Sequence, residues 1–380
     1  MAFGDEKMIL SPNRVEIDLS ALTHNLNEVK RLVGTKTKIM GIVKSDAYGH
    51  GAATVSRVLE KQGVHSLGVA HLYEALELRE KGMGCPIVVL CGIKTEEEAK
   101  AAIDKNLTPV LFDMNQVEFI ADECAKTGKR AGIYLKVDTG MGRLGILLSD
   151  LKSFLGKIMT YEEIFVEGLT SHLSSADEPS SAFTRLQVER FSKAIDIARS
   201  MGLSVPLNNL ANSAGVMGYR EAHFDMVRPG IMLYGGYPCP EFQSLATLRP
   251  VMHFKGQVIQ VKNLPDASPV SYGRTYHTTG QQTIAVISAG YGDGLPRSLS
   301  SVGKVLIGGK KVPILGRVCM NMIMADVSGS RGIRAGDEAV FLGLQGEEMI
   351  AGDDMASWAG TIAYEVFCSL GQRNKKEYRQ

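Results

Sequence analysis

The sequence predicts an α/β protein: a (β/α)8 TIM-type barrel followed by a C-terminal mostly-β domain. The first observation is that eight short apolar runs alternate with helical patterns, as expected for a parallel sheet that closes on itself. The second is that strand-like runs follow one another closely after about Leu248. We therefore expect a barrel domain over residues 1–248 and a β domain over residues 249–380.

The barrel strands are predicted from apolar runs that are too short for helices, and helix signals lie between them. Ser20 is expected to cap a helix whose apolar stripe has a period of 3.6 residues, and Thr95 with Glu98 forms a capping-box pattern. Only a brief helix fits after Ser213, where barrels often bind a phosphate group. In chain order the eight runs are 38–43, 66–70, 87–90, 109–112, 133–137, 166–171, 207–210 and 226–234.

The C-terminal domain is predicted from a different pattern, in which strands are joined by turns. The pair Gly308-Gly309 indicates a hairpin, and residues 353–364 are expected to form one closing helix. An open, doubly wound sheet is the main alternative for the whole chain. The expected strands are 251–261, 283–288, 304–306, 312–315 and 339–342.

Composition excludes several functional classes. The 42 basic and 41 acidic residues leave a net charge of +1, which offers no basic surface for nucleic acid. No apolar run approaches the ~18 residues that span a bilayer, and residues 1–10 carry acids and lack a signal-peptide core. The six cysteines form no C-x-x-C pair, and the histidines show no metal-ligand spacing. We expect a cytoplasmic protein with free thiols, no membrane contact and no metal.

Lys44 is the most informative single residue, because it directly follows the apolar run that ends at Val43. An ammonium group at the end of a buried strand is costly to desolvate unless the amine is neutralised or used covalently. One such use is a Schiff base with the aldehyde of pyridoxal 5′-phosphate (PLP). The alternative is a lysine whose side chain simply reaches water.

Further polar residues stand at the expected carboxyl ends of the strands, where barrels collect their chemistry. Each also has a structural interpretation: His172 as a satisfied buried histidine, Ser213 as a helix cap, Arg228 as the partner of a carboxylate. An amine, an Asn-Ser loop, a histidine and an arginine at one barrel mouth are hard to explain by packing alone. The full set is Lys44, His71, Gly92, Asp113, Lys136, Asp138, His172, Asn212, Ser213 and Arg228.

The motifs around these positions carry a resemblance that runs nearly end to end, and the chain resembles the alanine racemase family. The family uses PLP on a barrel of its own type, followed by a β domain. The matching segments are Val43 to Gly51, Lys136 to Gly145, Ser171-His172, Asn209 to Ser213, Val227 to Ile231, Ser271-Tyr272-Gly273, Gly290 to Gly294, Gly316 to Met320 and Gly360 to Glu365.

The resemblance implies a two-base reaction. Lys44 carries the cofactor and, once released, is the base for one enantiomer. Tyr272, supplied by the partner subunit of a homodimer, is the acid or base on the opposite face. A phenol with a pKa near ~10 needs help to act at neutral pH, and the family places His172 and Arg228 in that network. Arg228 is donor-only, so it would leave the pyridine nitrogen unprotonated and suppress transamination.

The resemblance also implies a set of binding residues. Arg143 would orient the substrate carboxylate, and Met320 and Tyr291 from the partner chain would limit the side chain to about a methyl group. Lys136 matches a position that some members carry as N6-carboxylysine, which would pair with Arg143. The cofactor and its phosphate would be held by Tyr48, Asn212, Ser213, Gly230, Ile231 and Tyr364.

One departure concerns the substrate range. Many relatives have an aspartate after the Cys-Met pair, where this chain has Asn321. The expected function is interconversion of L- and D-alanine, supplying D-alanine for peptidoglycan. A serine or broad-spectrum racemase on the same scaffold is the alternative. The Ser-Tyr-Gly segment disfavours a PLP-dependent decarboxylase, and the second domain disfavours a non-catalytic PLP carrier. The scattered histidines disfavour a metal enzyme.

Overall fold

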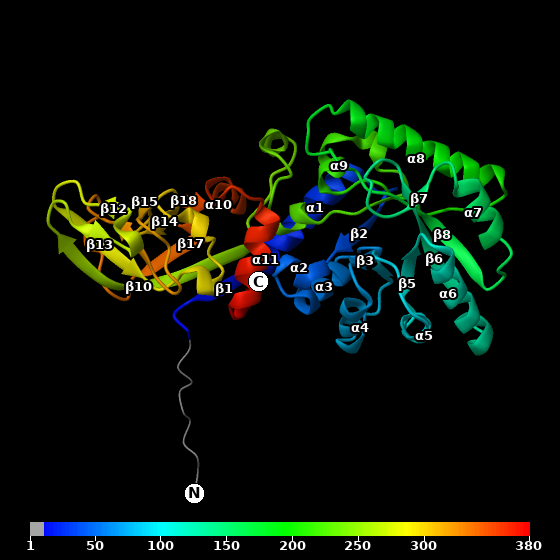
Figure 1. Cartoon of the computed structure of the whole chain (residues 1–380), viewed down its shortest axis with the longest axis horizontal. Helices are drawn as coiled ribbons and strands as arrows, with labels where there is room; N and C mark the ends of the chain where they lie inside the picture. The colour runs from blue at the N-terminus through cyan, green and yellow to red at the C-terminus, as the bar shows by residue number, and fades with distance from the viewer. Residues whose placement is uncertain (1–10) are drawn as a thin grey trace, which may run out of the picture. The chain divides into compact units, whose positions relative to one another are not determined.

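The computed structural model describes residues 11–380, which form two compact units (Figure 1). One unit is Ser20–Arg249; the other combines residues 11–19 with Pro250–Gln380. Residues 11–19 were expected in the barrel but belong to the antiparallel unit, because β1 (Arg14–Asp18) pairs with strands from the end of the chain. The expectation about a signal peptide falls on residues 1–10, outside the described part.

The unit Ser20–Arg249 is a ring of parallel strands with helices in the connections, as the sequence predicted. Most residues of its strands are buried, which matches their near-continuous apolar runs. The elements are α1 (Leu19–Val33), β2 (Lys38–Ile42), α2 (Lys44–Tyr48), α3 (Ala52–Lys61), β3 (Ser66–Val69), α4 (Leu72–Glu80), β4 (Ile87–Val89), α5 (Glu96–Asp104), β5 (Thr108–Leu111), α6 (Met114–Thr127), β6 (Ala131–Asp138), β7 (Ile146–Leu147), α7 (Leu151–Ile158), β8 (Ile164–Thr170), α8 (Ala182–Ser200), α9 (Ser213–Gly218) and β9 (Met226–Val227).

The ring closes through a single residue rather than through a full strand. Strands β2 to β6 pair in order, β6 pairs with β8, and Asn209 bridges β8 to β9, which returns to β2. The expected strand 207–210 is reduced to this bridge. The N–H groups of Leu207 and Asn209 donate to Glu167 and Leu169, but the Leu169 N–H donates to the Asn208 side chain at 3.0 Å instead of to the backbone. The eighth strand stops at Val227 because Pro229 cannot donate to a ladder.

Two helix predictions were partly right. Helix α1 begins at Leu19, so Ser20 lies in its first turn instead of capping it. Thr95 does cap α5 by accepting from the Glu98 N–H at 3.2 Å. The Glu98 carboxylate, however, accepts from the Lys94 N–H at 2.6 Å, one residue before the cap. In the described residues no helix is both long and apolar enough to cross a membrane.

The second unit is a curled antiparallel sheet. Strands β10, β17, β14, β15, β16 and β13 pair in that order, and β13 returns to β10. The Gly308-Gly309 hairpin is confirmed between β14 and β15. The elements are β10 (Met252–Leu264), β11 (Pro269–Val270), β12 (Tyr276–His277), β13 (Gln282–Ile287), β14 (Lys304–Ile307), β15 (Lys310–Leu315), β16 (Ile323–Asp326), β17 (Glu338–Gln345), β18 (Glu348–Ile350), α10 (Gly352–Ala359), α11 (Ala363–Arg373) and β19 (Lys376–Arg379).

The single helix expected at 353–364 is two helices. Helix α10 ends at Gly360, whose φ of +71° stops the helix in the left-handed region that glycine adopts without strain. Helix α11 starts afresh at Ala363. The fold class itself, a parallel barrel followed by a mostly-β unit, is confirmed.

Candidate active site

Lys44 lies two residues after the end of β2 and begins an unusual turn. The four following residues, Ser45 to Tyr48, all have φ between +53° and +55°, which is the left-handed helical region. This conformation costs ~1–2 kcal/mol for each residue that carries a Cβ. The turn is thus strained, and it places Lys44 at one end and the buried Tyr48 at the other.

Tyr48, Ser213 and Gly230 meet at the end of this turn. The Ser213 hydroxyl accepts from the Gly230 N–H at 2.9 Å and from the Met232 N–H at 3.3 Å. A Cβ added to Gly230 would lie 2.4 Å from the Tyr48 Oη, so only glycine lets the two approach. Tyr48 is held by its packing on Tyr234, with ring centroids 4.9 Å apart. Two hydroxyls and a backbone N–H thus converge on one small region.

Arg228 is buried, with 4% of its surface exposed, and it is held entirely by neutral acceptors. Its guanidinium donates to the Asn209 carbonyl at 2.9 Å and to the Asn209 side chain. It also donates to the carbonyls of Ser171 and Leu210 and contacts the His172 Nδ1 at 3.3 Å. Among residues 11–380, no carboxylate forms an ion pair with it, so the expected structural alternative is wrong.

Burial lowers the pKa of Arg228 to about 10, which still leaves it charged at neutral pH. The pKa of His172 lies well below its usual range because of burial and of the cations that surround it. A neutral imidazole therefore faces the guanidinium. The cations that act on His172 are, in order of effect, Arg228, Lys136, Arg143 and Lys44.

Lys136 belongs to the same cationic cluster. Burial, followed by the charges of Arg228 and Arg143, lowers the pKa of its amine to about 7. Arg143 is exposed and lies on the loop after β6, where the Asp138 carboxylate accepts from the N–H groups of Gly140 and Gly142. The structure thus brings together Lys44, Lys136, Arg143, His172 and Arg228 at the carboxyl ends of the strands. A site so rich in positive charge is suited to anions.

Three other strand-end residues serve local structure. Asn212 caps α9 by accepting from the Gly215 N–H at 3.0 Å. Asp113 caps α6 by accepting from the Asn115 N–H at 2.8 Å. His71 precedes α4, and its backbone N–H donates to Glu74 at 2.9 Å. Ile231 is fully buried in a 3-10 turn directly after Gly230.

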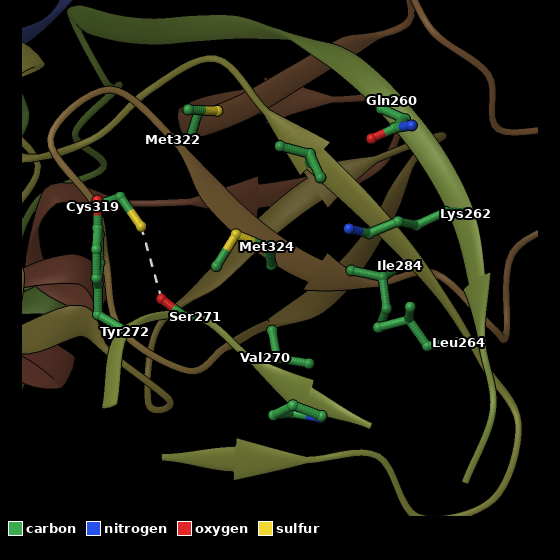
Figure 2. A pocket seen from close by; sticks show the side chains of 12 residues that line it. Gln260, Lys262, Leu264, Val270, Ser271, Tyr272, Ile284, Cys319, Met322 and Met324 are labelled. Atoms are coloured by element: carbon green, nitrogen blue, oxygen red, sulfur yellow. Dashed lines mark hydrogen bonds between the residues drawn. The ribbon is translucent and has the colours of Figure 1, made fainter. Parts of the chain in front are cut away.

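Tyr272 lies on the antiparallel unit, in a tight turn after β11, and its side chain is 69% exposed. The preceding Ser271 has a φ of +67°, and its hydroxyl donates to the Arg317 carbonyl at 2.6 Å. Figure 2 shows Ser271, Tyr272 and Cys319 at one side of a cavity of about 560 Å³, with the Ser271 hydroxyl 3.6 Å from the Cys319 thiol. Met322 and Met324 lie along the same cavity.

Tyr291 and Met320 form a second exposed group on this unit. The Tyr291 N–H donates to the Cys319 carbonyl at 3.0 Å, and the Gly292 N–H donates to the Met320 carbonyl at 2.7 Å. Asn321 contacts the Asp293 carboxylate at 3.4 Å through its side-chain amide. An aspartate at position 321 would be repelled there. Tyr364 lies on α11 of the same unit, and its role stays a prediction.

Two residues of the site were missed by the sequence reasoning. Asn209 accepts from Arg228 and, at 2.6 Å, from the Thr170 hydroxyl. Its signal was an amide pair, Asn208-Asn209, inside an apolar run. Glu74 is a buried carboxylate that no motif singled out. Two of its partners, the N–H groups of Ala70 and His71, are local, but the third, the Ser45 N–H, lies 29 residues away, so no local pattern reveals it.

Comparison with known proteins agrees along the whole chain. The alanine racemase N-terminal domain matches residues 17–238, and the alanine racemase C-terminal domain matches residues 251–378. An alanine racemase of Syntrophobacter fumaroxidans is 43% identical over 96% of each chain. Alanine racemase 2 of Caldanaerobacter subterraneus subsp. tengcongensis is 40% identical over 97% of this chain and 95% of its own.

Solved structures give the same result. The alanine racemase of the D-cycloserine-producing Streptomyces lavendulae superposes with a TM-score of 0.92 at 33% identity, over 98% of both chains. The alanine racemase of Bartonella henselae, solved with covalently bound pyridoxal phosphate, gives 0.87 at 29% identity, over 97% of this chain and 99% of its own. This chain therefore belongs to the alanine racemase family.

Proposed function

We propose that this protein is a PLP-dependent alanine racemase that interconverts L- and D-alanine by a two-base mechanism. The observation that supports it most is the placement of Lys44 within one electropositive strand-end cluster with Arg228 and His172. Family membership over both domains supports the same activity.

The residues present fit PLP. The hydroxyls of Tyr48 and Ser213 and the N–H of Gly230 suit a phosphate group, and any side chain at position 230 would close the space beside Tyr48. Arg228 has no carboxylate partner within residues 11–380 and suits a ring nitrogen that only accepts. When bound, PLP supplies a carbonyl carbon for amines and a ring that stabilises negative charge on the substrate α-carbon.

The protein's own residues then move the proton. We assign to the Lys44 amine the transfer at one face of the α-carbon, and to the phenol of Tyr272 of the partner subunit the transfer at the other. Arg228 keeps its charge at neutral pH, and His172 beside it stays neutral. The guanidinium therefore orients and polarises without exchanging a proton.

A homodimer is supported by the surface around Tyr272. Tyr272 is 69% exposed and stands among other exposed apolar side chains, a grouping that is typical of an interaction surface. Burial of that surface against a second copy would remove it from water. The exposed set is Tyr272, Tyr291, Met320 and Met322. No cysteine of residues 11–380 is in a disulfide, which supports a cytoplasmic enzyme whose D-alanine serves peptidoglycan synthesis.

Two groups of residues are assigned to substrate selection. Arg143 offers a planar fork to the substrate carboxylate, and Tyr291 with Met320 of the partner subunit would narrow the entrance. The contact between Asn321 and Asp293 favours a second candidate, serine or broad-spectrum racemisation, because an uncharged residue stands at the entrance turn. Turnover of alanine and serine by one preparation separates the two, since a racemase for alanine is expected to prefer it by at least ~10-fold.

The cofactor assignment can be tested by fixing the cofactor covalently to the protein. The purified protein is expected to absorb near the visible edge, and borohydride should fix the chromophore on the peptide that contains Lys44. Lys44→Ala should remove both the absorbance and the racemisation. A colourless protein that is unaffected by added PLP would contradict the assignment.

Lys136 is proposed to be carboxylated on its amine. Only a neutral amine attacks carbon dioxide, and with a pKa of about 7 a large share of Lys136 is neutral at pH 7, whereas an ordinary lysine is almost wholly protonated. The new carbamate would pair with Arg143, and one proton is released as the N–C bond forms. The adduct should therefore form above about pH 7 and be lost below it.

Carboxylation of Lys136 can be measured with isotope-labelled bicarbonate. Wild type is expected to show a carbamate carbonyl signal at about pH 8, which disappears on acidification through the amine's pKa of about 7. Lys136→Met should show no signal at any pH. A wild-type spectrum identical to that of the variant would exclude carboxylation.

A further inference from the structure

The turn from Ser45 to Tyr48 requires an external restraint. Four consecutive residues with side chains hold φ values of +53° to +55°. Isolated left-handed residues are tolerated in proteins, but a full left-handed turn is not adopted without compensating contacts. Its two ends, Lys44 and Tyr48, are the proposed amine and one of the proposed phosphate ligands. The shape of this turn therefore sets the spacing between them.

Glu74, in α4 of the next β/α repeat of the barrel, provides the restraint. Its side chain is buried, with 9% of the residue exposed, although it is a carboxylate. One oxygen accepts from the Ser45 N–H at 2.6 Å. The other accepts from the N–H groups of Ala70 and His71 at 2.7 and 2.9 Å. No cation forms an ion pair with Glu74 in the part of the chain that the structure describes.

We propose that Glu74 is a positioning residue for Lys44, holding the left-handed turn so that the Lys44 amine and the Tyr48 hydroxyl are presented at a fixed spacing. The proposal rests on the proposed function, in which those two groups bind one cofactor. Glu74 is assigned no direct role toward the cofactor or the substrate; it acts through the Ser45 N–H.

The comparison with Glu98 separates this role from ordinary helix capping. Glu98 stands at the same position in α5 as Glu74 does in α4, three residues after the cap, and it also accepts a backbone N–H, from Lys94 at 2.6 Å. Glu98 is half-buried, and its carboxylate accepts from Lys94 instead of from a residue of the turn. Glu74 differs from Glu98 in being more deeply buried and in its bond to Ser45.

Glu74→Gln is the discriminating substitution. The amide keeps one acceptor oxygen, which should stay with the two donors Ala70 and His71 and preserve the start of α4. Its NH2 group would then face the Ser45 N–H, so the bond to the turn is lost selectively. A hydrogen bond to a charged acceptor corresponds to roughly 10- to 100-fold in an equilibrium. We expect the affinity of the apoprotein for PLP to fall by about that factor.

A second measurement uses the apoprotein alone. Backbone amide exchange in residues 43–51 should become faster in Glu74→Gln, while the rest of the barrel is unchanged. Glu98→Gln is the matched control and should alter neither that exchange nor the affinity for PLP. If exchange in residues 43–51 and PLP affinity are both unaffected by Glu74→Gln, the proposal is wrong.

Ser45→Gly provides a rescue. Ser45 is exposed, so removing its side chain loses no packing, and glycine adopts its φ of +53° without strain. The double variant Glu74→Gln, Ser45→Gly is expected to recover most of the PLP affinity. A purely structural role for Glu74 at the start of α4 predicts no recovery, and that outcome would overturn the proposal.

Failure of the role proposed for Glu74 can be distinguished from failure of the proposed function. If Lys44 is not the cofactor lysine, Lys44→Ala will still be labelled after borohydride, and the proposed function fails first. If Lys44→Ala is unlabelled while Glu74→Gln captures PLP like wild type, the function stands and only the role of Glu74 is rejected.

Discussion

Tyr272→Phe should reduce proton exchange at the α-carbon by about 10²- to 10⁴-fold when the reaction starts from one enantiomer, and far less from the other. The asymmetry follows from the two-base assignment. The substitution removes only the phenolic oxygen, so the Lys44 amine can still withdraw a proton from its own face. What is lost is removal or delivery of a proton at the opposite face.

The measurement is single-turnover exchange of the α-proton with deuterated solvent, started separately from L- and D-alanine. Tyr276→Phe is the matched control, because Tyr276 lies in β12, which pairs with the strand preceding Tyr272, and donates to Gln282 at 3.0 Å. Loss of the Tyr276 hydroxyl should lower the stability of the protein but should affect exchange from L- and D-alanine equally. Equal losses from both enantiomers in Tyr272→Phe would show that the phenol is not a face-specific base.

Arg228→Glu is expected to convert part of the racemase activity into transamination. Arg228 keeps its positive charge because its pKa stays at about 10 despite burial. A protonated guanidinium can donate hydrogen bonds but cannot accept a further proton. When PLP is bound, a ring nitrogen beside this guanidinium would stay unprotonated and would withdraw electrons only weakly. A carboxylate in its place would accept a hydrogen bond from a protonated nitrogen and strengthen that withdrawal. Bound PLP would then draw more charge from the substrate, and transfer of the amino group to the cofactor, with water supplying the oxygen of pyruvate, would compete with racemisation.

Pyruvate formed per racemisation event is the quantity to measure, since it is independent of how much enzyme is active. Racemisation itself should fall by ~10²-fold, as is typical when a preorganised donor is removed from a buried site. Arg228→Gln is the control: it loses the same charge but introduces no carboxylate, so its pyruvate ratio should stay near that of wild type. An unchanged ratio in Arg228→Glu would argue against this role.

Much of the architecture was predictable because it depends on local patterns. The apolar runs at β2 to β6 and β8 became strands close to their expected bounds, and the short α9 appeared after Asn212. The prediction failed where a side chain replaced a backbone acceptor. The backbone of Leu207 and Asn209 still bonds to the neighbouring strand, but the Leu169 N–H donates to the Asn208 side chain, so only a bridge forms.

The candidate site residues could be selected from the sequence because a barrel places the residues that follow its strands at one edge. Their partners were not. The pairing of Arg228 with the carbonyls of Ser171 and Leu210 joins segments far apart in the chain. The absence of a carboxylate beside it, within residues 11–380, is a property of the folded molecule only.

By itself, the sequence determined the fold class, the order of elements and the residues at the strand ends, because periodicity and turn chemistry act over a few neighbours. The tertiary structure alone decided where β1 pairs, how the parallel ring closes through Asn209, and that Ser45 to Tyr48 turn left-handed. Each of these depends on contacts between distant segments, such as Glu74 with Ser45, whose free energy outweighs the local preference of the backbone.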